Sequence, residues 1–128
     1  MRQAAIAQAA AKSVQGRAPA WLYLFGRNSP VLDGRARAFH CADIPYAFNN
    51  TDRCASMTGG DAQARRVGNV ICDAWVRFAR TGNPNHPALP AWSPYDNAGG
   101  STMIFADNSR VASHPDRDEL GALEAATS

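Results

Sequence analysis

The stretch PAWLYLFG, residues 19–26, is apolar throughout between its flanking proline and glycine, with no alternation of polar side chains. A short apolar run of this kind is typical of a β-strand that is buried on both faces. The alanine-rich segment before it, residues 1–15, predicts a helix that Gly16 and Pro19 end. A helix followed by a doubly buried strand indicates an α/β protein with a parallel sheet.

A polar loop, residues 26–39, follows the strand and ends at His40. The clearest helix of the sequence spans about residues 61–80, where apolar side chains recur at three- and four-residue spacing. Asp61 is placed to cap the start of this helix, and Gly82 is placed to end it. The segment therefore predicts an amphipathic helix with one apolar face.

Four aromatic side chains between residues 75 and 95 bear on the core and on the edges of the predicted fold. Trp75 and Phe78 lie on the apolar stripe of the predicted helix, so we expect both in the core. A long connection rich in proline, glycine and asparagine, residues 81–101, holds Trp92 and Tyr95. We expect these two rings to cover an edge of the fold.

The C-terminal part predicts little regular structure. Residues 102–105 and 110–112 indicate a short hairpin, and the acidic, alanine-rich residues 116–128 indicate a frayed tail or a short helix. A doubly buried strand needs partners at both edges and layers on both faces. These elements do not complete such a sheet, so the sequence predicts either strands within apparent loops or a sheet that continues on another polypeptide.

Composition excludes several classes of function. A chain of 128 residues suits one domain, and a formal net charge of +2 with scattered arginines indicates a solvated surface, not a nucleic-acid site. The sequence contains no apolar run long enough to span a membrane and no segment resembling a signal peptide. Its three cysteines lack zinc-site spacing and are expected to be reduced thiols, which favours the cytoplasm. No metal ion or cofactor is expected, and localisation is otherwise undetermined.

Several segments, in order, resemble one family of enzymes. They are WLYLF (residues 21–25), AFHCADIPYAF (38–48), AWVRFARTGNPN (74–85), LPAWSPY (89–95) and TMIF (102–105). Together they are similar to the C-terminal part of the type-B carboxylesterases, the α/β-hydrolases that include the cholinesterases. The third segment is the most specific, because it is similar to the helix and tight turn that follow the catalytic-histidine loop.

The resemblance implies both a fold and a role for His40. Residues 1–115 would be the C-terminal segment of an α/β-hydrolase domain, incomplete by itself, and residues 116–128 a tail. His40 would be the histidine of a serine, histidine and acid triad, where an imidazole that titrates near neutrality takes and returns a proton. Asp43 would support the histidine loop by accepting backbone hydrogen bonds, although direct orientation of His40 by Asp43 is an alternative.

The sequence departs from the family in one large respect. It contains no G-x-S-x-G segment, and the family's triad acid and oxyanion hole lie upstream of the histidine. We therefore expect an ester-hydrolase segment that is inactive alone. To act on a small-molecule ester, it needs a complementing polypeptide or the rest of a longer natural chain. The alternatives are a non-enzymatic interaction module and a truncated gene product, either of which could self-associate through exposed apolar surface.

The remaining histidines and the neighbours of His40 are not expected to bind a metal ion. A metal site made of His40, Cys41 and Asp43 is disfavoured, because residues so close in sequence rarely converge on one ion. His86 and His114 stand in loops beside prolines, and we expect both to be exposed to solvent.

Overall fold

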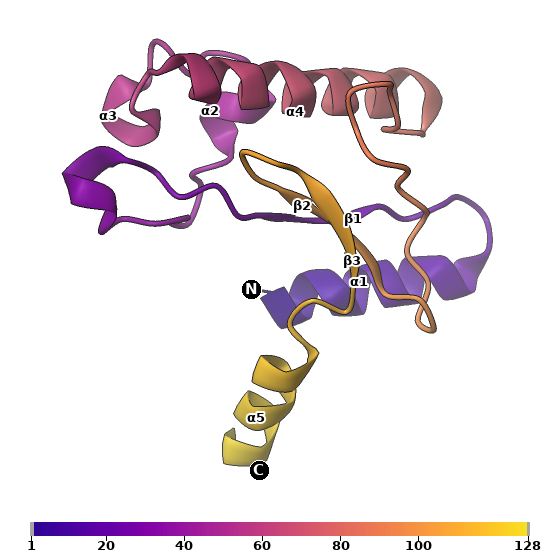
Figure 1. Cartoon of the computed structure of the whole chain (residues 1–128). Coiled ribbons are helices and arrows are strands. Elements are labelled where there is room, and N and C mark those ends of the chain that lie inside the picture. Colours follow the sequence, from indigo (N-terminus) through magenta and orange to yellow (C-terminus); the bar gives the residue numbers. More distant parts are fainter. Residues whose placement is uncertain (1, 128) are drawn as a thin grey trace.

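The elements of the described chain stack in three layers (Figure 1). The structure, a computed structural model, describes residues 2–127, so Met1 of the predicted first helix and Ser128 of the predicted tail lie outside the described residues. Helix α4 (Ala62–Thr81) covers one face of a small sheet, and helix α1 (Arg2–Gln15) lies beneath the other face. The arrangement is the central layer and two covers of an α/β fold, as the sequence predicts.

The strands within residues 2–127 form a mixed, three-stranded sheet. They are β1 (Leu22–Phe25), β2 (Ser101–Phe105) and β3 (Arg110–Ser113), in the order β1-β2-β3. Strand β1 runs parallel to β2, with Leu22 opposite Thr102, and β2 and β3 form an antiparallel hairpin. The parallel pair places the carboxyl ends of β1 and β2 at the same edge of the sheet.

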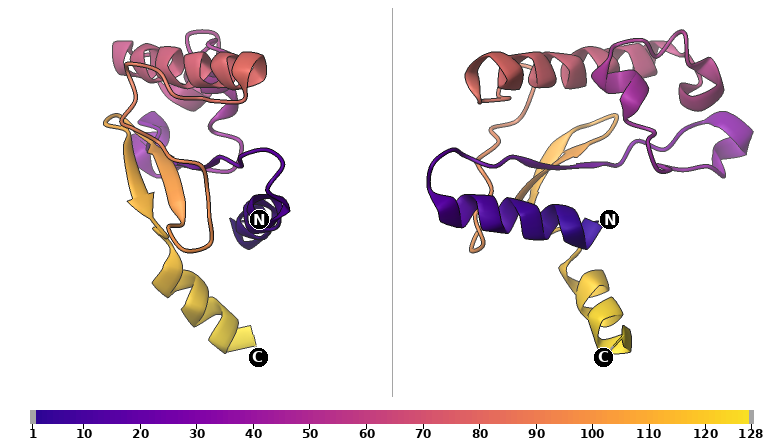
Figure 2. Two further views of the ribbon diagram at one scale, coloured as in Figure 1. Left: turned by 90° about the vertical axis from the view of Figure 1, so that its right-hand side faces the viewer. Right: turned by 180° about the vertical axis from the view of Figure 1, so that it is seen from behind.

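Short helical elements connect these layers. They are η1 (Val31–Gly34), α2 (Ile44–Ala47) and α3 (Ala55–Thr58) between β1 and α4, and α5 (Arg117–Thr127) after β3. Figure 2 shows that α5 projects away from the layered part, whereas α2 lies against α4. Helix α3 precedes α4 and contacts η1. The short helix that the sequence offers as one form of the C-terminal tail is thus present.

Helix α4 follows its predicted bounds because its determinants are local. The carboxylate of Asp61 accepts a hydrogen bond from the backbone N–H of Ala64 at 2.6 Å, which satisfies one of the unpaired donors of the first turn. Gly82 ends the helix with a φ of 76°, a left-handed conformation that glycine adopts without steric cost.

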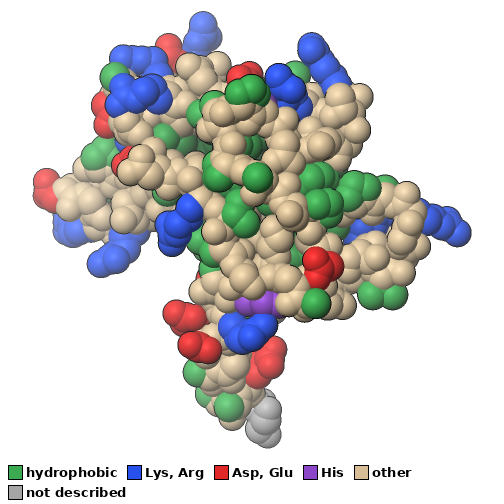
Figure 3. Space-filling view, turned by 45° about the vertical axis from the view of Figure 1, so that its right-hand side comes forward, with side chains coloured by type: hydrophobic (Ala, Val, Ile, Leu, Met, Phe, Trp, Pro, Cys, Tyr) green, Lys and Arg blue, Asp and Glu red, His purple; other side chains and the backbone are tan. Residues whose placement is uncertain are grey.

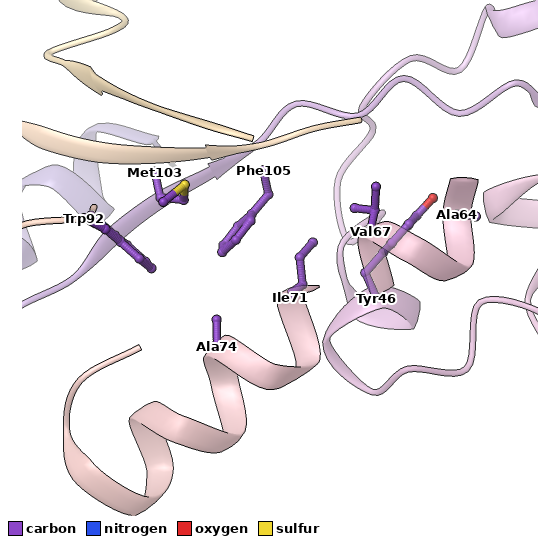
Figure 4. Packing of buried hydrophobic residues seen from close by; sticks show 8 residues of the cluster. All are labelled: Tyr46, Ala64, Val67, Ile71, Ala74, Trp92, Met103 and Phe105. Carbon is purple, nitrogen blue, oxygen red and sulfur yellow. The ribbon is translucent and has the colours of Figure 1, made fainter. Parts of the chain in front are cut away.

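The main core lies between α4 and the sheet (Figure 4). Its buried members are Tyr46, Ala64, Val67, Ile71, Ala74, Trp92, Met103 and Phe105. Phe105 is 1% exposed, and its ring meets those of Tyr23 and Trp92 edge to face at centroid distances of 5.5 and 5.9 Å. Such pairs stabilise a core beyond the area they bury. A smaller cluster of Ala9, Leu22 and Tyr95 joins α1 to the opposite face.

The aromatic residues are distributed differently from the prediction. Trp92 and Tyr95 are buried in the two clusters, at 6% and 5% exposure, and do not merely cover an edge. Trp75 and Phe78, predicted as core, are instead 47% and 45% exposed. The prediction for Trp75 and Phe78 was wrong because helical spacing defines which face is apolar but not how fully that face is covered. Trp75 meets Tyr23 edge to face at 6.1 Å, yet both residues line an open groove.

Strand β1 has only part of the burial that its sequence predicts. It faces a helical layer on each side, but only Leu22 is buried, and Tyr23, Leu24 and Phe25 remain partly exposed. The reason is its position, because β1 is an edge strand and has no strand partner on its other side among residues 2–127. The sheet is therefore partial in the described chain.

A glycine in the middle of α4 allows the chain after α2 to pass close to the helix. A Cβ atom added at Gly68 would lie 3.2 Å from the side chains of Asn49 and Thr51, tighter than ordinary van der Waals contact. We expect Gly68→Leu to destabilise the fold by about 1–3 kcal/mol through overpacking. Gly121→Leu is the matched control, because a Cβ there meets nothing within 4 Å. Urea unfolding of both variants checks this, and equal midpoints would contradict it.

Candidate functional site

His40 lies on the connection between the carboxyl end of β1 and helix α2. The chain leaves β1 at Phe25, passes through η1 and reaches His40 four residues before α2 begins at Ile44. Loops at the carboxyl ends of parallel strands are where α/β proteins place their ligands. The His40 side chain is exposed and makes no hydrogen bond to any other residue that the structure describes. Its imidazole is thus accessible for proton transfer.

Asp43 is hydrogen-bonded to β1, and no hydrogen bond or ion pair joins it to the described His40 side chain. Its Oδ2 atom accepts a hydrogen bond from the hydroxyl of Tyr23 at 2.7 Å, and its side chain makes no capping bond to the backbone of α2. The Asp43 side chain thus accepts no backbone hydrogen bond from the described residues, whereas its carbonyl oxygen accepts from the N–H groups of Tyr46 and Ala47 at 3.0 Å each. The support comes from Tyr23, a β1 residue that sequence reasoning missed because it is 20 positions away.

Burial keeps the Tyr23 hydroxyl protonated in its hydrogen bond to Asp43. It raises the pKa of the Tyr23 hydroxyl, and the hydrogen bond and negative charge of Asp43 raise that pKa further. The hydroxyl therefore remains a donor to Asp43 throughout the ordinary pH range. The contact joins β1 to the residue three positions after His40.

Arg27 is the second residue of the site region that the sequence analysis missed. It was included among the solvated arginines, but it is only 4% exposed, which overturns that interpretation for this position. It lies just after β1, and its Nε donates to Asp107, just after β2, at 2.8 Å. A buried guanidinium requires such partners, so Arg27 is part of the structure at the carboxyl edge of the sheet.

An apolar groove opens on the side of the molecule formed by α4 and the sheet. Its lining residues are Trp21, Tyr23, Ala74, Trp75, Phe78, Pro84, Trp92 and Phe105, around a volume of about 110 Å³. Figure 3 shows apolar side chains exposed across the middle of one face of the molecule. The groove contains the exposed aromatic residues of α4, and Tyr23 connects its floor to Asp43.

The loop after α4 is anchored by polar contacts and is not freely solvated. His86, predicted to be exposed, is buried at 9% exposure, with Nε2 3.0 Å from the carbonyl oxygen of Val70. The Asn85 side chain both donates to and accepts from the backbone of Trp92, at 2.8 and 2.9 Å. These contacts hold Trp92 in the groove wall. His114 is partly buried, with Nε2 3.3 Å from the carbonyl oxygen of Ala98.

Potential metal ligands do not cluster among the described residues. No grouping of histidine, cysteine or carboxylate side chains within residues 2–127 could hold an ion, and His40, Cys41 and Asp43 do not form one. Cys41, Cys54 and Cys72 are unpaired thiols with intermediate exposure. None of the helices in the described part combines the length and apolar composition needed to cross a membrane.

The site contains an exposed imidazole, which is one of the two groups that a base-assisted nucleophilic attack needs. An accessible imidazole can act as a general base when a hydroxyl lies within hydrogen-bonding distance. The structure brings Tyr23, Asp43 and the His40 loop together, but it pairs no described serine with His40. A nucleophilic reaction at His40 would therefore need a hydroxyl that the described residues do not place beside it.

Comparison with known proteins finds one family and several similar sequences. A family model described as the carboxylesterase family matches residues 2–122. The phenmedipham hydrolase of Pseudarthrobacter oxydans is 34% identical over 115 residues, which is 84% of this chain and 23% of that protein. The para-nitrobenzyl esterase of Bacillus subtilis is 29% identical over 121 residues, 93% of this chain and 24% of that protein.

Solved structures agree with the sequence matches. A thermophilic PNB esterase superposes with a TM-score of 0.77 at 28% identity, over 92% of this chain and 24% of its own. A carboxylesterase of Geobacillus stearothermophilus gives a TM-score of 0.74 at 32% identity, over 89% of this chain and 23% of its own. The chain thus has the fold of one part of these esterases, and it spans about a quarter of their length.

Proposed function

This chain belongs to the carboxylesterase family, and on that basis we propose that it is the segment of a serine ester hydrolase that carries the catalytic histidine, His40. The observation that carries the proposal is the position of His40. It stands on the loop that leaves the carboxyl end of β1, in a chain whose family match extends from residue 2 to residue 122. The exposure of the ring supports the same role, since a base must reach its nucleophile.

The proposed mechanism is the two-step acyl transfer of serine hydrolases. A serine hydroxyl from outside the present sequence attacks the ester carbonyl while His40 accepts its proton, and the departing alkoxide then receives that proton from His40. Water repeats the cycle on the acyl-serine and releases the carboxylic acid. The triad acid and the oxyanion-hole donors also lie outside these residues, so the chain alone is inactive. The substrate class is a small-molecule ester.

The completing polypeptide would join at the open side of β1. That strand presents unpaired backbone groups at one edge, a template for another strand. The adjacent groove exposes Trp75 and Phe78, which would become buried by such a partner. In the absence of that partner, the same surface would favour self-association. Within this proposal, residues 1–115 are the hydrolase segment and residues 116–128 an appendage.

The isolated chain provides the first test. We expect the wild-type chain and His40→Ala to hydrolyse p-nitrophenyl acetate at the same background rate, because neither holds a nucleophile and an oxyanion hole. Initial rates at matched protein concentration, with buffer alone as the reference, measure this. A rate above background that disappears in His40→Ala would show that the chain builds its own nucleophile site, which contradicts inactivity in isolation.

A chimera tests the catalytic role itself. This chain would replace the matching 121-residue segment of the Bacillus subtilis para-nitrobenzyl esterase, which provides the rest of an esterase chain. We propose that the folded chimera hydrolyses p-nitrophenyl acetate and that its activity requires His40. A folded, inactive chimera would count against the catalytic role.

The exposed aromatic groove also supports a second candidate, a non-enzymatic interaction module. In that case Trp75 and Phe78 would contact a partner that has no esterase sequence features, and His40 would have no catalytic role. The identity of a co-purifying partner distinguishes the two functions. A partner with a G-x-S-x-G segment supports the hydrolase, and one without it supports the module.

A further inference from the structure

The guanidinium of Arg27 is at the centre of a buried polar cluster. Its partners, with donor–acceptor distances, are Asp107 Oδ1 (2.8 Å), Tyr46 Oη (2.9 Å), the carbonyl oxygen of Thr58 (3.2 Å), and the two carboxylate oxygens of Asp61 (3.2 and 3.4 Å). At 4% exposure, an arginine needs such bonds to offset the loss of its hydration. All three guanidinium nitrogens donate, so the side chain is held in one orientation.

Two of these residues lie on either side of His40 in the sequence. Arg27 is near the start of the segment that leaves β1, and Tyr46 belongs to α2, which follows His40. The bond from Nη1 to the Tyr46 hydroxyl therefore joins the two ends of the loop, and the guanidinium carbon also lies 5.8 Å from the centre of the Tyr46 ring. The Arg27 side chain therefore holds together the two ends of the segment that carries His40.

Ser29, which lies within this loop, makes two further hydrogen bonds that hold it. The backbone N–H of Ser29 donates to the carbonyl oxygen of Arg37 at 3.1 Å, and the Ser29 hydroxyl donates to the carbonyl oxygen of Met57 at 2.6 Å. After His40, the Tyr23–Asp43 bond attaches the loop to β1. His40 thus lies on a short stretch between Arg37 and Asp43 that is fastened on both sides.

The remaining bonds of Arg27 connect the loop to the rigid layers. Asp107 follows β2, and Asp61 is the N-cap of α4, so the guanidinium contacts both the sheet and the helical layer. A functional side chain is placed most accurately when its support comes from such rigid elements. The cluster lies entirely within this chain and needs no contribution from a completing polypeptide.

We propose that Arg27 is the positioning residue of the His40 loop and that it holds the loop in its working conformation before any partner joins. The inference rests on the proposed catalytic role of His40 for its functional meaning, and its structural content is tested separately. The residue type is specific, because only arginine offers several donors in one planar fork. A lysine would keep the charge but could not reach Tyr46, Asp61 and Asp107 together.

A purely stabilising role for Arg27 makes a different prediction. In that case, replacing Arg27 would lower the unfolding temperature, but the loop in the molecules that remain folded would keep its order. A positioning role requires that the loop around His40 become mobile while the layers stay rigid. Backbone ¹⁵N relaxation distinguishes the two, because it reports order residue by residue.

The experiment compares the wild-type chain with Arg27→Lys and Arg35→Lys, at a temperature where all three are folded. We expect the order parameters of residues 39–42 to fall from about 0.85 to below about 0.6 in Arg27→Lys, with α4 unchanged. Arg35→Lys is the matched control, since Arg35 is exposed on the same loop and donates only to the Leu32 carbonyl. It should leave residues 39–42 ordered.

Tyr46→Phe is a second test of the proposal. It removes the hydroxyl that accepts the bond from Arg27 and keeps the buried ring. We expect the same loss of order at residues 39–42. Unchanged order in both Arg27→Lys and Tyr46→Phe would overturn the proposal, as would equal loosening of α4. Failure of His40-dependent hydrolysis in the chimera would leave these relaxation results intact, so the two proposals fail separately.

Discussion

Replacing His40 with alanine should lower ester hydrolysis by the chimeric esterase by about four to six orders of magnitude. The size of the effect follows from the proposed chemistry. A neutral serine hydroxyl is a weak nucleophile, and without a base it must lose its proton to water in the transition state. The alkoxide leaving group then also lacks its proton donor. Both steps of the reaction are affected, so kcat should fall far more than KM changes.

His114→Ala is the matched control for this measurement. It removes the same imidazole from a position after β3, where His114 Nε2 lies 3.3 Å from the Ala98 carbonyl oxygen. We expect its activity to remain within a few-fold of the unmodified chimera. Far-ultraviolet circular dichroism confirms that all variants are folded. An active chimera that retains its rate after His40→Ala would exclude the triad role of this histidine.

Replacing Phe105 with alanine should destabilise the chain by about 3–5 kcal/mol, a large part of the stability of a domain this size. Phe105 is 1% exposed and lies with Trp92 between α4 and the sheet (Figure 4). Its ring contacts those of Tyr23 and Trp92 edge to face. The substitution removes this ring and leaves a cavity that helix and sheet cannot both close. The midpoint of thermal unfolding should drop by roughly 10–20 °C.

Phe48→Ala makes the same chemical change at the surface. Phe48 is 75% exposed, so its removal should alter the free energy of unfolding by less than about 0.5 kcal/mol. Differential scanning calorimetry of both variants measures the contrast. Similar midpoints for the two variants would mean that the cluster under α4 does not govern the stability of the chain.

Sequence reasoning was most successful where the determinants of structure are local. The apolar spacing of α4, the Asp61 cap and the Gly82 stop all act within a few residues, and each is present in the structure. The parallel strand was also predicted from its own residues and its flanking proline and glycine. Its partner β2 was found only as part of a hairpin, because the pairing of distant strands has no local signal.

The residues that support the histidine loop could not be predicted in the same way. Arg27 resembles any surface arginine in sequence, and its ion pair with Asp107 spans 80 positions. Likewise, Tyr23 was assigned only to a buried strand, although its hydroxyl fixes Asp43. Such contacts arise from the assembled layers. His86 shows the same limit, since its burial depends on the Val70 carbonyl oxygen of a neighbouring helix.

The parallel pairing of β1 with β2 has a consequence for synthesis on the ribosome. Leu22 is opposite Thr102, so the apolar first strand leaves the ribosome long before its partner exists. The interval between Arg27 and Asp107 is 80 residues, and at about 5–20 residues per second such a stretch takes roughly 4–16 seconds to translate. During that time β1 lacks β2, the strand with which it pairs in the described structure. Nascent-chain chaperones that shield extended apolar segments should therefore bind this chain early, and slower translation should increase its aggregation.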